Sequence, residues 1–150
     1  MDLKKKIQED LKKALKEGDT LKRSVLSMLK AEINNAEIAK KRKELNKNEI
    51  LEVVMKEVKK RKDAILAYKQ GGREDAAKSE QKEMEILEGY LPKKLTEEKL
   101  KKIIQEVLKR TGAKSESDFG KVMGVLMPKI KGQADGAAVS VLVKKELSKT

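Results

Sequence analysis

Hydrophobic residues recur at helical spacing along nearly the whole chain. At the start they follow one another in steps of four, at Leu3, Ile7, Leu11 and Leu15. This spacing places them on one face of an α-helix, so it predicts an amphipathic helix over residues 3–16. After a break at Gly18, Asp19 or Thr20 can cap a second helix, which we expect to reach about Lys43. Its apolar stripe comprises Leu21, Val25, Met28, Leu29, Ile33 and Ala36.

Two further helices are predicted before residue 91. Asn46 and Glu49 have the spacing of a capping box, in which each side chain bonds the backbone N–H of the other residue. The helix that follows carries an apolar stripe at Ile50, Val53, Val54, Val58, Ile65 and Tyr68. Gly71 and Gly72 end this helix, and a shorter one then runs to near Gly89.

Pro92 marks the expected boundary between two parts of the chain, because proline biases the preceding residue away from helical backbone. Three short amphipathic helices are predicted beyond it, and they begin at Thr96, near Ser115 and at Asp135. The expected fold class is therefore all-α. Residues 1–91 form an N-terminal bundle of about four helices, and residues 92–150 form a small three-helix domain.

The composition excludes several kinds of active site. The 150 residues include no His and no Cys, so the commonest general base, a thiolate nucleophile and Cys-ligated metals are ruled out. We expect no catalytic residue, no metal and no cofactor. No apolar run approaches the ~20 residues of a membrane span, and no apolar segment follows the charged N-terminus as in a secretory signal. The expected compartment is the cytoplasm, with no membrane partner.

A large positive charge indicates an anionic partner, and nucleic acid is the first candidate. The formal net charge is +12, and residues 91–150 carry +7 of it, with 14 Lys and Arg against 7 Asp and Glu. A Lys- and Glu-rich surface is also typical of heat-adapted proteins, so a purely solvating role stays open. Two Tyr, one Phe and no Trp argue against a reader of single strands that stacks bases on aromatic rings.

The segment 119–136 departs from ordinary helix patterning. It holds four of the nine glycines and, at Pro128, one of the two prolines. Gly120 and Gly124 are four apart on a predicted helix, where each glycine costs about 1 kcal/mol relative to alanine. We expect a compensating close approach at these positions. Tight packing of a neighbouring helix is the first interpretation, and approach of a ligand backbone is the second.

The end of this segment is a lysine-bearing turn that leads into a helix beginning at Asp135 and Gly136. Backbone amides and the helix dipole favour anions at such an N-terminus. The candidates to surround a phosphate there are Lys121, Lys129, Lys131 and Gly132. Asp135 also has a simpler interpretation as an N-cap, and the two roles can coexist. The nucleotide-binding patterns GxxxxGK[ST] and GxGxxG do not occur.

Three stretches carry a resemblance. They are Gly120-Lys-Val-Met-Gly followed by Met127-Pro-Lys-Ile-Lys-Gly-Gln-Ala-Asp-Gly, residues 21–38, and residues 88–96. The first resembles the signature of the YqeY family, the second that family's second helix, and the third its hinge between helical parts. The resemblance covers almost the whole chain. That family is related to the C-terminal tail of the B subunit of the glutamine-dependent aminoacyl-tRNA amidotransferase.

The resemblance implies an all-α protein with an N-terminal helical domain and a small C-terminal three-helix domain. Because the amidotransferase tail resembles a tRNA-binding module, it also implies tRNA or another structured RNA as partner. The residues that would face the RNA are Lys121, Lys129, Lys131 and Gly132. The chain departs from the family pattern at Gln133, where Arg is expected, and at Ala137, where Lys is common. Both departures remove positive charge from this face.

Carboxylates and serines offer weaker candidates for chemistry. Glu80 and Glu83 share a helix face at a spacing of three and can bind a cation or exchange a proton, but their surroundings are typical of a solvated face. Ser24 and Ser27 lie among basic residues, as in a Ser–Lys arrangement, but we favour small polar positions on an exposed helix.

The long N-terminal helices carry many lysines and arginines, such as Arg61, interleaved with glutamates, such as Glu57. Mixed charges of this kind are typical of a solubilising surface.

Three functions remain open from the sequence. The first is an accessory protein that binds tRNA or another structured RNA without catalysis. The second is a protein-interaction module that docks an enzyme subunit, for example of an amidotransferase or a synthetase. The third, implied by the resemblance alone, is a carbon–nitrogen ligase with glutamine as amido-N-donor, for which no catalytic constellation is visible.

Overall fold

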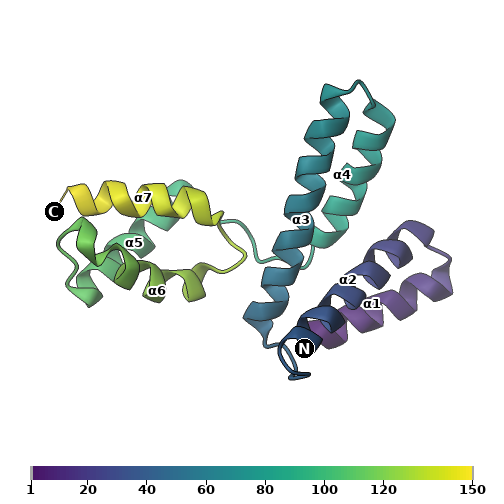
Figure 1. The fold of residues 1–150 in the computed structure, drawn as a ribbon, viewed down its shortest axis with the longest axis horizontal. Coiled ribbons are helices and arrows are strands. Elements are labelled where there is room, and N and C mark those ends of the chain that lie inside the picture. Colours follow the sequence, from purple (N-terminus) through teal and green to yellow (C-terminus); the bar gives the residue numbers. More distant parts are fainter. Residues whose placement is uncertain (1, 150) are drawn as a thin grey trace. The chain divides into compact units, whose positions relative to one another are not determined.

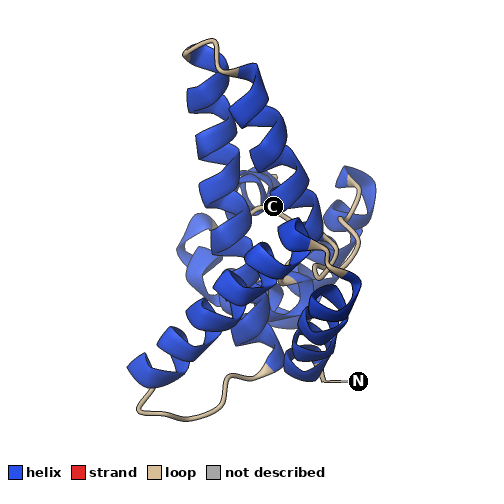
Figure 2. Cartoon of the chain, turned by 90° about the vertical axis from the view of Figure 1, so that its right-hand side faces the viewer, coloured by secondary structure: helices blue, strands red, loops and turns tan. Residues whose placement is uncertain are grey.

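The computed structural model describes residues 2–149, and these residues form α-helices joined by short turns (Figure 1). Figure 2 shows helices and loops and no strand among the described residues. The expected all-α fold is therefore confirmed. The helices group into two compact units, one ending at Leu91 and the other beginning at Pro92.

The first unit contains four helices: α1 (Leu3–Glu17), α2 (Thr20–Ala39), α3 (Lys47–Gln70) and α4 (Glu74–Glu88). They form two antiparallel hairpins, α1–α2 and α3–α4 (Figure 1). The hairpins share one apolar core, because each helix presents a stripe of aliphatic side chains to it. This core includes Ile7, Val25, Leu26, Leu29, Ile33, Ile50, Val54, Val58, Ile65, Ala77, Met84 and Leu87.

Local capping bonds fix where these helices begin. The Asp19 carboxylate accepts a hydrogen bond from the backbone N–H of Lys22 at 3.1 Å. The predicted capping box is present, since Asn46 accepts from the backbone of Glu49 at 2.9 Å and Glu49 accepts from the backbone of Asn46 at 3.0 Å. The end of α2 differs from the prediction, because the helix stops at Ala39 rather than near Lys43.

One member of the predicted apolar stripe of α1 is not in the core. Leu15 is 54% exposed, whereas its neighbour Ala14 is buried. The buried face of α1 therefore rotates by one position in its last turn. A small side chain faces the rest of the unit there, and the large one faces solvent.

The prediction of a solvated surface of mixed charge is wrong for Arg61 and Glu57 of α3, because both side chains are buried. The Arg61 guanidinium donates to a Glu57 carboxylate oxygen at 3.1 Å, and its Nε lies 3.5 Å from Glu83 of α4. Lys60 also contacts Glu57, at 3.3 Å. A charge that leaves water is tolerated only when it is paired in this way.

The Glu80–Glu83 pair likewise differs from the predicted solvated face, because both side chains are partly buried beside Arg61. Burial raises the pKa of Glu80, and the negative charge of Glu83 raises it further. Glu83 faces the Arg61 guanidinium. The two carboxylates are therefore part of the packing between α3 and α4.

The second unit contains α5 (Glu97–Thr111), the short 3-10 helix η1 (Glu116–Asp118), α6 (Phe119–Ile130) and α7 (Gly136–Ser148). The three α-helices pack around a separate aliphatic core. Its buried members are Leu100, Ile104, Val107, Ala113, Val122, Leu126, Ile130, Val139, Val143 and Leu147. This unit carries the glycine- and lysine-rich turn singled out from the sequence.

Candidate nucleic-acid interface

The turn between α6 and α7 is shaped by two residues of the predicted motif. Gly132 is buried and has a φ of 80°, in the left-handed region that favours glycine. Asp135 caps α7, and its carboxylate accepts a hydrogen bond from the backbone N–H of Ala137 at 3.4 Å. The simpler role expected for Asp135 is thus present.

Gln133 joins this turn to the segment that precedes α5. Its carbonyl oxygen accepts a hydrogen bond from the backbone N–H of Leu95 at 2.9 Å, and its side-chain amide donates to the carbonyl oxygen of Lys93 at 3.3 Å. The amide of Gln133 can form this neutral bond where the Arg of the family pattern would place a charge. The departure at this position therefore has a structural role in this chain.

These two bonds place four lysines on neighbouring segments, and we call the four the lysine rim: Lys93, Lys94, Lys129 and Lys131. Three of the rim side chains are exposed and the Lys131 side chain is partly exposed. Lys93 and Lys94 were not among the residues predicted from the sequence. The available signal was two adjacent lysines directly after Pro92. Gln133, which bonds this segment, lies 40 positions from Lys93 along the chain, so the contact is not visible in the sequence.

The structure does not bring Lys121 to the lysine rim. Lys121 lies eight residues before Lys129 on the same helix, which separates their backbones by about 12 Å along the axis. Its ammonium group donates to the carbonyl oxygen of Thr111, the last residue of α5, at 3.2 Å. A cation at a helix C-terminus is favourable because the helix dipole is negative there.

Asp118 contributes negative charge at that same end of α6. Its carboxylate accepts the backbone N–H of Lys114 at 3.0 Å. This bond holds the pKa of Asp118 below its ordinary value, with smaller contributions from the Ser115 backbone and the charge of Lys121. Asp118 thus offsets part of the positive charge of Lys121.

Gly120 and Gly124 do not mark tight helix packing. A side-chain Cβ built at either position would meet no atom within 4 Å, and both residues are exposed. The packed face of α6 is instead formed by Val122, Leu126 and Ile130. The packing interpretation of the two glycines is therefore wrong, and the open backbone leaves the other interpretation, approach by a ligand, as a prediction.

The two remaining motif residues lie at the ends of helices. Pro128 is exposed in the last turn of α6, where its missing N–H removes the bond that the Gly124 carbonyl would accept. Gly136 is the first residue of α7, and a Cβ there would lie 3.8 Å from the Met127 methyl group, an ordinary contact. Neither position places a charged group at the turn.

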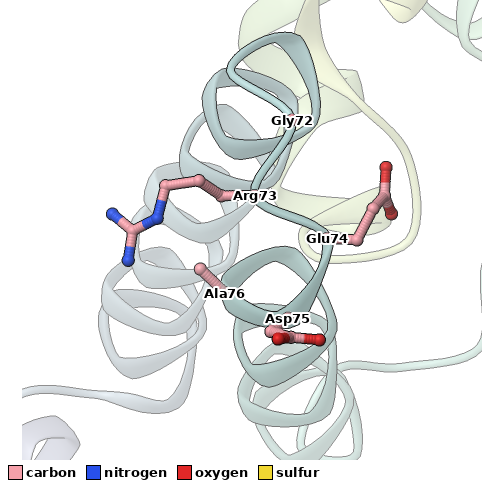
Figure 3. Close-up of a pocket in the computed structure, with 5 residues that line it drawn as sticks. All are labelled: Gly72, Arg73, Glu74, Asp75 and Ala76. Carbon is pink, nitrogen blue, oxygen red and sulfur yellow. The ribbon is translucent and has the colours of Figure 1, made fainter.

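A pocket of about 310 Å³ lies at the tip of the α3–α4 hairpin, lined by residues 72–76. Figure 3 shows Arg73 pointing away from Glu74 and Asp75. The Arg73 guanidinium lies over the ring of Tyr68, 5.0 Å from its centroid. The two carboxylates lie in the first turn of α4, where they stabilise the positive end of the helix. We assign no chemistry to this pocket.

Ser24 and Ser27 are exposed on α2, as expected for small polar positions. Among residues 2–149, no three Asp or Glu side chains lie together in a way that could hold a metal ion. Within that range, no helix combines the length and the apolar character that a membrane crossing requires.

Fold and composition together define a small, basic, all-α protein made of two helical units. A family model described as "Yqey-like protein" matches residues 4–147. The chain therefore belongs to the YqeY family, as the resemblance of its motifs implied.

Among curated proteins, the chain is similar to yeast proteins named "Altered inheritance of mitochondria protein 41, mitochondrial". The Kluyveromyces lactis protein is 34% identical over 84 residues, which cover 56% of this chain and 45% of the relative. The Eremothecium gossypii protein is 32% identical over 85 residues, which cover 57% of this chain and 46% of the relative. The matched stretch thus spans about half the length of these relatives. Their names say that those proteins are mitochondrial, and a cytoplasmic location for this chain stays a prediction.

Proposed function

We propose that this protein is a non-catalytic accessory protein that binds tRNA or another structured RNA through the lysine rim of its second unit. The observation that carries the proposal is that Gln133, in the turn before α7, bonds the segment of Lys93 and Lys94, so that the rim lysines lie on two adjoining segments. Ammonium groups and a helix N-terminus both favour phosphate. Tyrosine and phenylalanine are too few for base stacking, so shape and backbone charge would dominate recognition.

The test measures tRNA binding as a function of salt. With about 4–6 phosphate contacts, the affinity should fall by orders of magnitude between low and physiological salt. The variant Lys93→Gln/Lys94→Gln/Lys129→Gln should bind at least 10-fold more weakly at 50 mM salt. The plot of the logarithm of the binding constant against the logarithm of the salt concentration should have a slope that is shallower by about two to three, since each lost phosphate contact removes about 0.7–0.9 from it.

A matched control removes the same charge from the same unit. Lys109, Arg110 and Lys145 are exposed and lie several helical turns from the 131–135 turn along α5 and α7. Their triple Gln variant should bind within about twofold of the unaltered protein. Absence of tRNA binding by the unaltered protein at 50 mM salt would overturn the proposal. Equal losses in both triple variants would reduce it to a nonspecific effect of net charge.

A second candidate function, docking of a protein partner, is favoured by the exposed face of α6. Gly120 and Gly124 leave its backbone open, and the adjacent Val125 is 38% exposed. Such a face fits a closely approaching helix of an enzyme subunit. Here the Gly120→Gln/Gly124→Gln variant should lose a protein partner that survives nuclease treatment, while tRNA binding stays unchanged.

Amide formation with glutamine as nitrogen donor is the third function implied by the family resemblance. The Glu80–Glu83 pair is partly buried beside Arg61, in packing between two helices. Assays of glutaminase and of ATP-dependent transamidation with the purified chain test this alternative. Activity abolished by Glu80→Gln would favour it over the binding functions.

A further inference from the structure

The turn that follows α2 has an unusual backbone. Lys41 and Arg42 have φ values of 60° and 65°, in the left-handed region that side chains with a Cβ disfavour. Every other described residue with a positive φ is a glycine, at Gly18, Gly72, Gly112 and Gly132. In this one turn, two consecutive basic residues occupy positions for which glycine is the better residue.

Contacts from both sides hold this turn in place. The backbone N–H of Arg42 donates to the carbonyl oxygen of Glu37 at 2.7 Å. The Glu37 carboxylate receives the Lys4 ammonium of α1 at 2.9 Å and the backbone N–H of Leu45 at 3.1 Å. The bond from Lys4 is the main reason that the pKa of Glu37 lies below its ordinary value. The strained turn is thus fixed between α1, α2 and the segment leading to α3.

Three of the four basic side chains at this turn are exposed to solvent, and the fourth is paired. Lys40 forms a 2.6 Å ion pair with Glu49, which neutralises the first of the four consecutive basic residues. Lys41, Arg42 and Lys43 are exposed, and within residues 2–149 none of these three side chains forms a hydrogen bond or an ion pair. We call these three residues the basic turn. Mutual repulsion and backbone strain both oppose it, so stability alone does not account for it.

We propose that the basic turn is a second phosphate-binding site, which contacts the sugar–phosphate backbone of the RNA bound by the second unit. This inference rests on the proposed function. A guanidinium flanked by two ammonium groups on a fixed backbone suits phosphodiester oxygens. A lipid surface is less well matched. The exposed face of α2 near the turn carries Asn34 and Asn35, and its one large apolar side chain, Ile38, which is 62% exposed, does not make the apolar stripe of a membrane-surface helix.

The experiment replaces the strained residues by glycine, which removes charge and strain together. The variant Lys41→Gly/Arg42→Gly should bind a transcribed tRNA at least fivefold more weakly at 50 mM salt, with a salt slope shallower by about 1.4–1.8. The midpoint of its urea unfolding should stay the same or rise. Loss of binding without loss of stability separates a ligand contact from a structural role.

Lys12 and Lys16 supply the control, because they are exposed on α1 and lie toward its C-terminal end, whereas Lys4, which contacts Glu37, lies at its start. The variant Lys12→Ala/Lys16→Ala removes the same charge and should bind tRNA within about twofold of the unaltered protein.

The two proposals fail in different ways. If the unaltered protein binds tRNA but the glycine variant binds as well as the α1 control, the basic turn is not a phosphate site and the proposed function stands. If the unaltered protein does not bind tRNA, both proposals are wrong. The last experiment measures binding of the unaltered protein and of the glycine variant to phosphatidylserine–phosphatidylcholine vesicles. Vesicle binding that the glycine substitutions weaken, with tRNA binding unchanged, would overturn the RNA assignment in favour of a lipid surface.

Discussion

Substitution of Arg61 by methionine should strongly destabilise the first unit. Arg61 is the buried cation between α3 and α4, where its guanidinium contacts the Glu57 carboxylate at 3.1 Å and the Glu83 carboxylate at 3.5 Å. Methionine fills much of the same volume but leaves the buried Glu57 carboxylate with only Lys60, at 3.3 Å, as its cationic contact. The effect expected is therefore one of charge rather than of a cavity.

The magnitude follows from the burial of the pair. Removing one partner of a buried ion pair costs about 3–5 kcal/mol, and the remaining contact with Lys60 places Arg61→Met near the lower end, at about 3 kcal/mol. With an m-value of about 2 kcal/mol per molar urea, the midpoint should fall by about 1.5 M. Tyr68 and Tyr90 are the only tyrosines and both lie in the first unit, so tyrosine fluorescence reports its unfolding selectively.

Two further variants decide whether the loss arises from unpaired charge. Glu57→Leu/Arg61→Met removes both partners and should recover at least half of the lost stability, because apolar replacement of a buried pair is often neutral or stabilising. Lys59→Met, on the exposed face of the same helix, should change stability by less than about 0.5 kcal/mol. A loss below 1 kcal/mol for Arg61→Met, or a double variant as unstable as the single one, would refute the reasoning.

Three other predictions concern the Tyr90 hydroxyl, with Tyr68→Phe as its control, the Glu80 carboxyl group and the backbone of Gly132. Tyr90→Phe removes the 2.6 Å hydrogen bond from the Tyr90 hydroxyl to Asp10 and should cost about 1–2 kcal/mol by urea unfolding. Tyr68→Phe should be close to neutral. Glu80→Gln should stabilise the protein at pH 7 by less than about 1 kcal/mol, because burial and Glu83 raise the pKa of Glu80 in the folded state and so disfavour its charged form. Because the pKa of Glu80 is higher in the folded state, this gain should shrink as the pH falls toward 4.5, the ordinary pKa of the group, and should be absent below it, where Glu80 is protonated in both states. A gain that persists below pH 4.5 would contradict the assignment. Gly132→Ala should cost about 1–2 kcal/mol, because its left-handed backbone disfavours a Cβ, and circular dichroism of urea unfolding checks this.

Helix boundaries that depend on local bonds were predictable from the sequence. Capping bonds join residues only two or three positions apart, as in the Asn46–Glu49 box and at Asp19 and Asp135. The amino-acid sequence alone therefore specifies them. The end of α2 was predicted four residues too late. Its helical composition continues past Ala39, while the turn that ends it depends on Glu37 and its partner Lys4, which lies 33 residues away.

Sequence reasoning found only part of the candidate site. Lys129, Lys131 and Gly132 lie together at the turn before α7, as their nearness in sequence requires. Lys93 and Lys94 join them only through the hydrogen bonds of Gln133. Lys121 was grouped with the turn because it belongs to the same motif, but two turns of α6 separate it from Lys129.

By itself, the sequence determined the all-α class, the capped starts of the helices, the excess of positive charge and the family. These properties follow from composition and from interactions within a few residues. Only the tertiary structure decided which charges are buried and which are displayed. Arg61 and Lys41 belong to the same basic pattern in the sequence, yet Arg61 is 6% exposed and Lys41 is open to solvent. Burial depends on which helix packs against a residue, and that neighbour lies far away along the chain.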